Sequence, residues 1–316
     1  MSDRDERIVI TGAAGLVGQN LVTLLAEQGR TNLVAIDKHA DNLAVLAQLH
    51  PEVRTLAADL AEPGVWEREV ATADVLVQLH AQIAGKSDKP FVRNNVEATR
   101  RVIDILRARG HAFVIHASSS VVHSIAHDHY TESKKAQERL VVESGLAYCI
   151  LRPTLMFGWF DPKHLGWLAR FMERTPIFPI PGHGRYMRQP LYNRDFCRAI
   201  AVCIRARPNR AAYDLTGPER IDYIDMIRAI REAKGLRTPV VRIPISLFKA
   251  LLRTYALFSA KPPFTADQLD ALVAGDAFEG VDIEATFGFA PTPFREALRE
   301  TFGHPVYSRI ALASPH

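Results

Sequence analysis

Tyr130 and Lys134 are the two residues whose types and spacing point most directly to chemistry. They lie four positions apart in a segment with helical patterning, so both side chains face the same side of the helix. A lysine ammonium beside a phenol favours the phenolate, and we therefore expect Lys134 to lower the pKa of Tyr130 from its ordinary value of about 10. The pair is then predicted to transfer protons, with Tyr130 as the general base near neutral pH.

A glycine-containing segment near the start of the chain predicts a phosphate site. A buried strand at 7–10 runs into Thr11-Gly12-Ala13-Ala14-Gly15-Leu16-Val17-Gly18, and apolar residues at helical spacing follow from Leu16. Gly12 allows the tight turn, Gly15 lets a pyrophosphate approach the backbone, and Gly18 packs the helix on the strand. The first N–H groups of that helix, at Leu16, Val17 and Gly18, would face the anion. The segment thus predicts a dinucleotide site.

Asp37 refines this prediction. It ends the second apolar strand, at 32–36, about 20 residues after the glycines. A carboxylate there accepts hydrogen bonds from the ribose hydroxyls and repels a 2′-phosphate. Although Lys38 and His39 follow directly, we expect NAD to bind in preference to NADP.

Strands and helices alternate along the first half of the chain. Strands are predicted at 7–10, 32–36, 53–57, 74–79, 112–116 and 147–151, and helices at 16–28, 41–50, 65–70, 91–109 and 130–144. This order predicts an α/β fold, a Rossmann-type doubly wound parallel sheet whose ligands lie beyond the carboxyl ends of the strands. Ser118, Ser119 and Ser120 follow such an end and could orient a substrate alcohol.

Composition describes an ordinary globular protein. The 316 residues include 47% hydrophobic and 23% charged ones, with a net charge of +4 that argues against a nucleic-acid partner. Cys149, Cys197 and Cys203 have no metal-binding spacing, so we expect free thiols and no metal site. The polar segment 1–7 leads directly into the first strand, and no apolar run reaches the ~18 residues of a membrane span. We expect a cytoplasmic protein without stable membrane insertion.

Further motifs, in order along residues 7–200, make the chain resemble an extended short-chain dehydrogenase/reductase, of the branch with sugar-nucleotide epimerases, dehydratases and reductases. Beyond the glycines, the matching residues are Asp59-Leu60, Leu79-His80-Ala81, Asn95-Val96, Ser118-Ser119-Ser120, Tyr130 with Lys134, and Leu151-Arg152-Pro153 with Gly158. The resemblance implies that Asp59 and Leu60 hold adenine and that His80, Ala81, Asn95 and Pro153 lie beside NAD. It also implies that Lys134 holds the nicotinamide ribose.

The resemblance also implies a catalytic serine beside Tyr130. We choose Ser119 and leave Ser120 to contact the substrate, because Ser119 lies four residues before His123, where the family often has tyrosine. Ser120 remains the alternative. We further expect a small-molecule substrate and a homodimer.

The last third of the chain is predicted to bind the substrate. We divide the chain into an NAD-binding domain at 1–160 and a mainly helical, mainly substrate-binding region at 161–316, with a helix at about 193–206 packing back on the first domain. Arg188 and Tyr192 lie in a segment that resembles the family segment whose arginine grips the nucleotide pyrophosphate. A bidentate guanidinium suits that task.

Two departures keep other functions open. Leu155 stands where sugar-nucleotide members usually have asparagine, and the connection from His123 to Tyr130 is short. We expect hydride abstraction from a carbohydrate hydroxyl, most simply of a nucleotide sugar, through a transient keto intermediate, with epimerisation and net oxidation or reduction both open. The alternatives are oxidation or reduction of a sugar acid or a 3β-hydroxysteroid-like alcohol, and a non-catalytic dinucleotide binder similar to the accessory complex I subunit of this fold. Segment 245–258 is expected to be a core helix rather than a membrane-surface helix.

Overall fold

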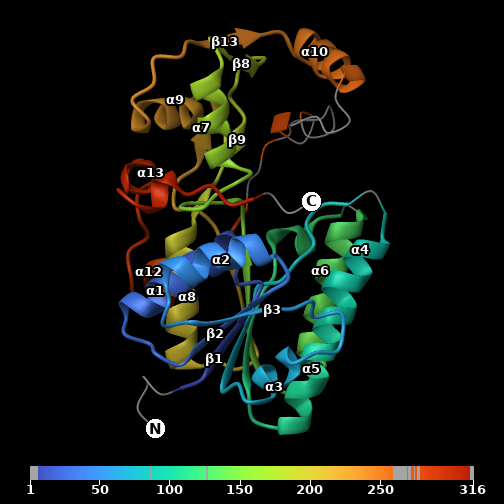
Figure 1. The fold of residues 1–316 in the computed structure, drawn as a ribbon. Coiled ribbons are helices and arrows are strands. Elements are labelled where there is room, and N and C mark those ends of the chain that lie inside the picture. Colours follow the sequence, from blue (N-terminus) through green and yellow to red (C-terminus); the bar gives the residue numbers. More distant parts are fainter. Residues whose placement is uncertain are drawn as a thin grey trace.

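Seven parallel strands form the central sheet of the protein (Figure 1). The computed structural model describes residues 6–85, 87–125, 127–258, 269, 272–273, 275 and 278–313. The strand order across the sheet is β11-β6-β5-β4-β1-β2-β3. The bounds are β1 Ile8–Thr11, β2 Leu33–Asp37, β3 Arg54–Ala57, β4 Val75–Gln78, β5 Phe113–Ala117, β6 Ala147–Pro153 and β11 Ala211–Leu215. The predicted Rossmann-type α/β fold is confirmed.

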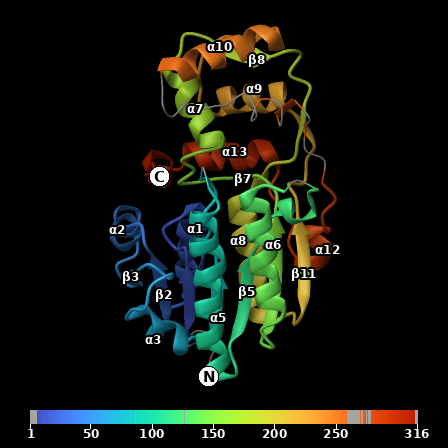
Figure 2. The ribbon, with the colours of Figure 1, turned by 90° about the vertical axis from the view of Figure 1, so that its right-hand side faces the viewer.

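Helices cover both faces of this sheet, as Figures 1 and 2 show. α1 (Leu16–Glu27), α2 (Ala40–Leu49), α8 (Asn193–Ala206) and α12 (Ile283–Phe287) share one apolar core with the sheet. α3 (Trp66–Ala71), α5 (Ala98–Arg109) and α6 (His129–Val142) share the core on the other face. Because both faces are covered, central strands such as β1 and β4 are buried along their whole length, which explains their continuous apolar sequences.

The order of the strands reverses between β1 and β4. From β1 the chain builds outward through β2 to β3, and it then returns to β4 on the other side of β1 and continues outward to β5 and β6. The crevice at the carboxyl ends of β1 and β4 is therefore the topological switch point, where open α/β sheets bind their ligands.

A smaller upper lobe lies beyond the carboxyl ends of the strands (Figure 2). Its elements are β7 Met156–Phe157, α7 Leu165–Arg174, β8 Phe178–Pro181, β9 Met187–Arg188, β10 Leu191–Tyr192, β12 Ile221–Asp222, α9 Tyr223–Ala233, β13 Val240–Ile243, α10 Ile245–Phe258 and α13 Phe294–Gly303. Aromatic and aliphatic side chains from these elements, among them Phe157, Met172, Ile227 and Phe294, form its core. A short η3 turn (Tyr307–Arg309) follows.

The chain returns to the lower domain after residue 160. α8 packs against α1, and β11 adds a seventh strand beside β6. β11 is not among the strands expected from the sequence, because its Ala211-Ala212-Tyr213-Asp214-Leu215 has no strong strand pattern. The predicted 161–316 region is therefore divided: most of it forms the upper lobe together with β7, whereas α8, β11 and α12 belong to the lower domain. Residues 1–5 and 314–316 lie outside the described residues.

Short helical segments of unusual type flank α5 and α6. α4 (Lys89–Phe91) leads into a π-helix, η1 (Val92–Glu97), which continues directly into α5. A 3-10 turn, η2 (Ser120–His123), follows β5. π-Helical turns are frequent at functional sites, and η1 carries Asn95.

Candidate active site

The glycines at the end of β1 allow two close approaches of the backbone and leave one open position. A Cβ on Gly12 would lie 2.5 Å from the His80 nitrogen, and Gly12 has a φ of +75° that favours glycine. A Cβ on Gly18 would overlap the Ala13 backbone. Gly15, by contrast, is exposed and would meet only the Gly12 oxygen, at 3.4 Å. Gly12 and Gly18 therefore permit packing of the protein itself, whereas Gly15 leaves space open at the switch point.

This open position is the N-terminus of α1. Gly15 is the N-cap residue and supplies no side-chain cap, so the first turn, formed by Leu16, Val17 and Gly18, presents backbone N–H groups to an anion. The arrangement fits the pyrophosphate of a dinucleotide.

Asp37 closes the adenosine side of the loop. One carboxylate oxygen accepts a hydrogen bond from the Ala14 nitrogen at 3.0 Å and the other from the His39 nitrogen at 2.9 Å. The carboxylate is thereby fixed at the end of β2 beside the glycine loop. Each oxygen retains a second lone pair that a ribose hydroxyl could use.

Asp59 is held by an arginine that the sequence did not single out. Its carboxylate accepts hydrogen bonds from the Ala61 nitrogen at 3.0 Å and the Arg93 guanidinium at 2.8 Å, while Leu60 is buried beneath. Burial opposes ionisation of Asp59, but the Arg93 and backbone hydrogen bonds outweigh it and lower the pKa of this carboxyl.

Asn95 joins the end of β4 to the helix that carries Tyr130. Its amide donates to the Gln82 oxygen at 3.0 Å and accepts from the Gln82 nitrogen at 2.6 Å. The same amide donates to the Ser133 hydroxyl at 2.8 Å, and Ser133 in turn donates to the Tyr130 carbonyl. Asn95 is fully buried, so in this structure it positions α6 relative to the segment that contains the exposed Ala81.

Ser119, the residue before η2, lies against the Tyr130 phenol. The Ser119 hydroxyl lowers the pKa of the Tyr130 phenol, and it accepts a hydrogen bond from the Val121 nitrogen at 3.4 Å. Ser120 is buried at the start of η2. Of the two serines, the structure brings Ser119 to the tyrosine.

The expected effect of Lys134 on Tyr130 is not found in this structure. Burial is the largest influence and raises the pKa of Tyr130; the Ser119 hydroxyl lowers it, and the nearby Asp128 carboxylate raises it. The Lys134 ammonium instead donates to the Ala117 carbonyl at 2.9 Å and to Gln137 at 2.8 Å. The helical spacing placed both residues on one face correctly, but it could not show that the lysine turns toward the end of β5.

Lys134 itself is poised to titrate. The residue is 1% exposed, and desolvation lowers the pKa of its ammonium to about 7 even though the Glu138 carboxylate raises it. Because a buried ammonium has lost its hydration, each hydrogen bond that it donates helps to stabilise the charged form of Lys134.

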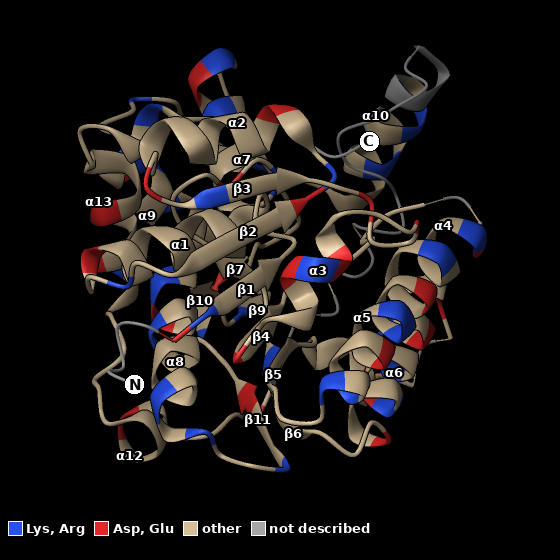
Figure 3. Cartoon of the chain, turned by 60° about the horizontal axis from the view of Figure 1, so that its bottom comes forward, with Lys and Arg blue, Asp and Glu red and all other residues tan. Residues whose placement is uncertain are grey.

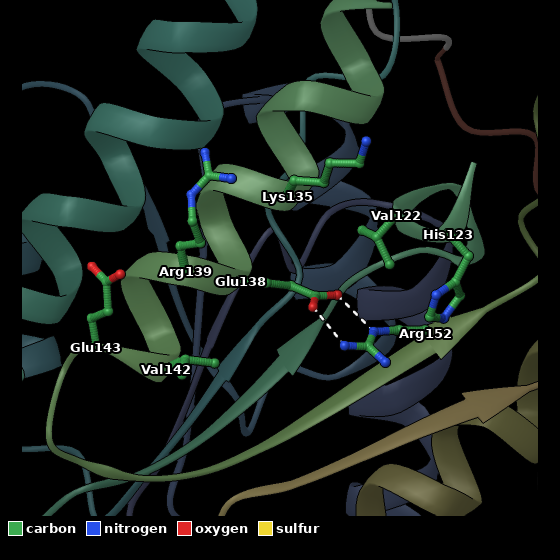
Figure 4. A pocket seen from close by; sticks show the side chains of 8 residues that line it. All are labelled: Val122, His123, Lys135, Glu138, Arg139, Val142, Glu143 and Arg152. Carbon is green, nitrogen blue, oxygen red and sulfur yellow. Dashed lines mark hydrogen bonds and ion pairs between the residues drawn. The ribbon is translucent and has the colours of Figure 1, made fainter. Parts of the chain in front are cut away.

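A separate hollow of about 320 Å³ lies beside α6, and Figure 4 shows the side chains that line it. Val122, His123, Lys135, Glu138, Arg139, Val142, Glu143 and Arg152 line it. Within it, Arg152 donates two hydrogen bonds to Glu138, at 2.9 and 2.7 Å, which fasten α6 to β6. The glycine loop, Asp37 and Tyr130 do not line this hollow.

The predicted substrate residues lie in or beneath the upper lobe. Arg188, in β9, is 8% exposed and donates to the Leu272 carbonyl at 2.7 Å. Tyr192 is 1% exposed and packs against Phe157, with ring centroids 5.6 Å apart. Pro153 is buried at the end of β6. A role for Arg188 or Tyr192 in substrate binding stays a prediction.

Acidic and basic positions are interleaved along α5 and α6 (Figure 3).

Within the described part of the chain, no helix is long and apolar enough to cross a membrane.

A Rossmann domain with an open glycine loop, a strand-end aspartate and a serine-tyrosine-lysine site defines the class of dinucleotide-dependent oxidoreductases. The model of the NAD dependent epimerase/dehydratase family matches residues 8–215, and the chain belongs to this family. Its cofactor is NAD, and it is an enzyme of oxidoreductase type.

Known relatives are distant in sequence. The chain is 25% identical over 244 residues to a ceramide reductase of Caulobacter vibrioides, covering 75% of this chain and 73% of the relative. It is 27% identical over 271 residues to a 3 beta-hydroxysteroid dehydrogenase/Delta 5-->4-isomerase of Mycobacterium tuberculosis, covering 75% and 72%. A dTDP-glucose 4,6-dehydratase from Streptomyces venezuelae, solved with NAD, shares the fold with a TM-score of 0.73 at 19% identity, over 93% of this chain and 95% of that one.

Proposed function

We propose that this protein oxidises a carbohydrate hydroxyl of a nucleotide sugar to a transient ketone, as an NAD-dependent epimerase or dehydratase does. The observation that carries the proposal is the proximity of the Ser119 hydroxyl to the Tyr130 phenol, whose pKa it lowers. It places a hydroxyl donor and a titratable phenol together, next to the end of the sheet where the cofactor fits.

In the proposed reaction the substrate carbon loses a hydride and its hydroxyl loses a proton, leaving a carbonyl. Bound NAD would supply the hydride acceptor and, through its oxidised nicotinamide, a positive charge at the site. Tyr130, as phenolate, accepts the proton while Ser119 holds the substrate oxygen. Because burial raises the pKa of Tyr130 in the protein alone, we expect Tyr130 to become an effective base only when a cation lies beside it.

The nucleotide part of the substrate is assigned to the upper lobe through Arg188. If its guanidinium grips a pyrophosphate, Arg188→Ala should weaken the binding of UDP or dTDP by roughly 1.5 to 3 kcal/mol, the range for hydrogen bonds to charged groups. Arg188→Lys should recover part of the loss, since an ammonium keeps the charge but lacks the planar fork. Calorimetry on the NAD-loaded protein would measure both.

Arg228→Ala is the matched control. Arg228 is an exposed arginine of α9 in the same lobe, and it pairs with Asp225 at 2.9 Å. Its loss should leave nucleotide binding unchanged. No nucleotide binding by the wild type, or unchanged binding by Arg188→Ala, would contradict the nucleotide-sugar assignment.

A hydrophobic alcohol is the second candidate substrate. Leu155 packs against the core of the upper lobe at the place where an asparagine is expected for nucleotide sugars. Two of the relatives, the ceramide reductase and the hydroxysteroid dehydrogenase, are named for hydrophobic substrates of this class. Turnover of a sterol or ceramide that is indifferent to Arg188→Ala would favour this candidate.

A non-catalytic binder is the third candidate. It is disfavoured because the chain carries Ser119, Tyr130 and Lys134. We also expect a homodimer, which light scattering after size-exclusion chromatography would test.

A further inference from the structure

Gln137 connects the buried Lys134 to the interior of the domain. One turn after Lys134 on α6, its side-chain oxygen accepts a hydrogen bond from the Lys134 ammonium at 2.8 Å. Its amide nitrogen donates to the Thr99 hydroxyl of α5 at 2.9 Å. Gln137 and Thr99 are both fully buried. Since the ammonium can only donate, its contact fixes which way the Gln137 amide is turned.

Thr99 extends the connection to the end of β4. Its hydroxyl oxygen accepts from Gln137 and also from the Gln78 amide at 2.8 Å, so its own proton is left for the His80 ring nitrogen Nε2, at 3.2 Å. His80 must then accept at Nε2 and carry its proton on Nδ1, which donates to the Thr11 hydroxyl at 2.9 Å.

His80 can play this part only as the neutral imidazole. Desolvation, followed by the repulsion of the Lys134 and Lys38 cations, lowers the pKa of His80 to about 3. The hydrogen bonds therefore run without a break from Thr11, the residue before Gly12, through neutral groups to the ammonium.

We infer that Gln137 is a positioning residue that fixes the Lys134 ammonium at the end of β5 and thereby sets the pH range in which NAD is held tightly. The inference rests on the proposed contact of Lys134 with the nicotinamide ribose. Gln137 would not touch the cofactor itself.

The physical reason is the high cost of burying a cation. The charged and titratable groups coupled to Lys134 are Glu138, which stabilises its charge, His80, which follows the end of β4, and His116 in β5. Both histidines are kept neutral by burial and by Lys134 itself, so they add no compensating charge. Besides Glu138, the ammonium relies on two oxygens, those of Ala117 and Gln137. Removing one of them destabilises the charged form.

The test is the dissociation constant of NAD measured by calorimetry across pH 5.5 to 9 without any sugar. In the wild type, affinity should be constant at low pH and should weaken as Lys134 loses its proton near its pKa of about 7. Gln137→Leu should move this midpoint to lower pH by roughly half a unit or more, and Gln137→Glu should move it to higher pH, because a carboxylate stabilises the cation. Opposite shifts are not expected from a simple loss of packing.

Two controls define the outcomes. Lys134→Met should abolish the midpoint. Gln19→Leu removes another fully buried glutamine, one that donates to the Asn42 carbonyl at 2.8 Å far from Lys134, and it should leave the midpoint in place.

An unchanged midpoint in both folded Gln137 variants, or a midpoint that persists in Lys134→Met, would overturn the inference. If Gln137→Leu does not fold, Gln137→Glu decides alone: a midpoint moved to higher pH supports the inference, and an unmoved midpoint overturns it. Because no sugar is present, a wrong substrate assignment leaves this result untouched. Conversely, if the protein turns over a nucleotide sugar but the Gln137 variants do not shift the pH midpoint of NAD affinity, the proposed function stands and only the role of Gln137 is overturned.

Discussion

The Ser119 hydroxyl lies beside the Tyr130 phenol and lowers its pKa, although Ser119 precedes η2 and Tyr130 lies in the first turn of α6. Asp128 is the N-cap residue of α6. Its carboxylate accepts a hydrogen bond from the Thr131 nitrogen at 2.9 Å, and this contact fixes where the helix begins. Asn95 holds the same turn through Ser133 at 2.8 Å. The contact of serine with tyrosine is therefore built into the local fold.

Ser119→Ala should lower the turnover number by a factor on the order of 10² because it removes the hydroxyl that orients the substrate oxygen, whereas Ser120→Ala should change it only slightly. Steady-state kinetics of both variants would measure this. Equal losses, or a larger loss in Ser120→Ala, would show that the wrong serine has been assigned.

Asp37→Asn should reduce the preference for NAD over NADP. The substitution keeps the size of the side chain but removes the charge that repels a 2′-phosphate, so the ratio of the two affinities should fall by roughly tenfold or more. Titration of both cofactors into wild type and variant gives the ratio. A wild type that binds both equally would refute the role of Asp37.

The stability of the NAD-free protein should depend on pH through Lys134. Its pKa is about 7 in the folded chain and 10.5 ordinarily, so between these values the unfolded chain holds a proton that the folded chain has lost. Stability from this group therefore rises as pH increases from 7 toward 10.5. Relative to Lys134→Met, the free energy of unfolding of the wild type should rise across this window by roughly 4 to 5 kcal/mol. Denaturant unfolding at several pH values measures the difference; parallel curves would mean that Lys134 is not desolvated.

The lower domain could be predicted from sequence because its signals are local. Continuous apolar strands such as Ile8–Thr11 are what a sheet covered on both faces requires. The helix expected from about residue 193 is α8. β11 was not predicted because it is an edge strand. Its place is decided by pairing with β6, a contact that no local sequence pattern encodes.

The hydrogen-bond partners of the candidate site residues were not predictable from helical spacing alone. Helical spacing put Tyr130 and Lys134 on one face, yet the ammonium binds Ala117 and Gln137. Gln137 lies three residues after Lys134, so the same spacing rule could have found it. His80 was expected beside NAD only through the family resemblance, and Thr99 was not singled out, because it approaches Gln137 and His80 from another helix.

The most direct test of the account is the appearance of reduced nicotinamide absorbance when the NAD-loaded protein meets a panel of nucleotide sugars, sugar acids and hydroxysteroids. We predict a signal, or product formation, with a nucleotide sugar. We further predict that Tyr130→Phe, which keeps the ring but removes the base, lowers the rate by a factor on the order of 10² to 10⁴ while NAD still binds. Near-normal rates in Tyr130→Phe on the true substrate would contradict the proposed mechanism, and a response to hydroxysteroids alone would contradict the proposed substrate.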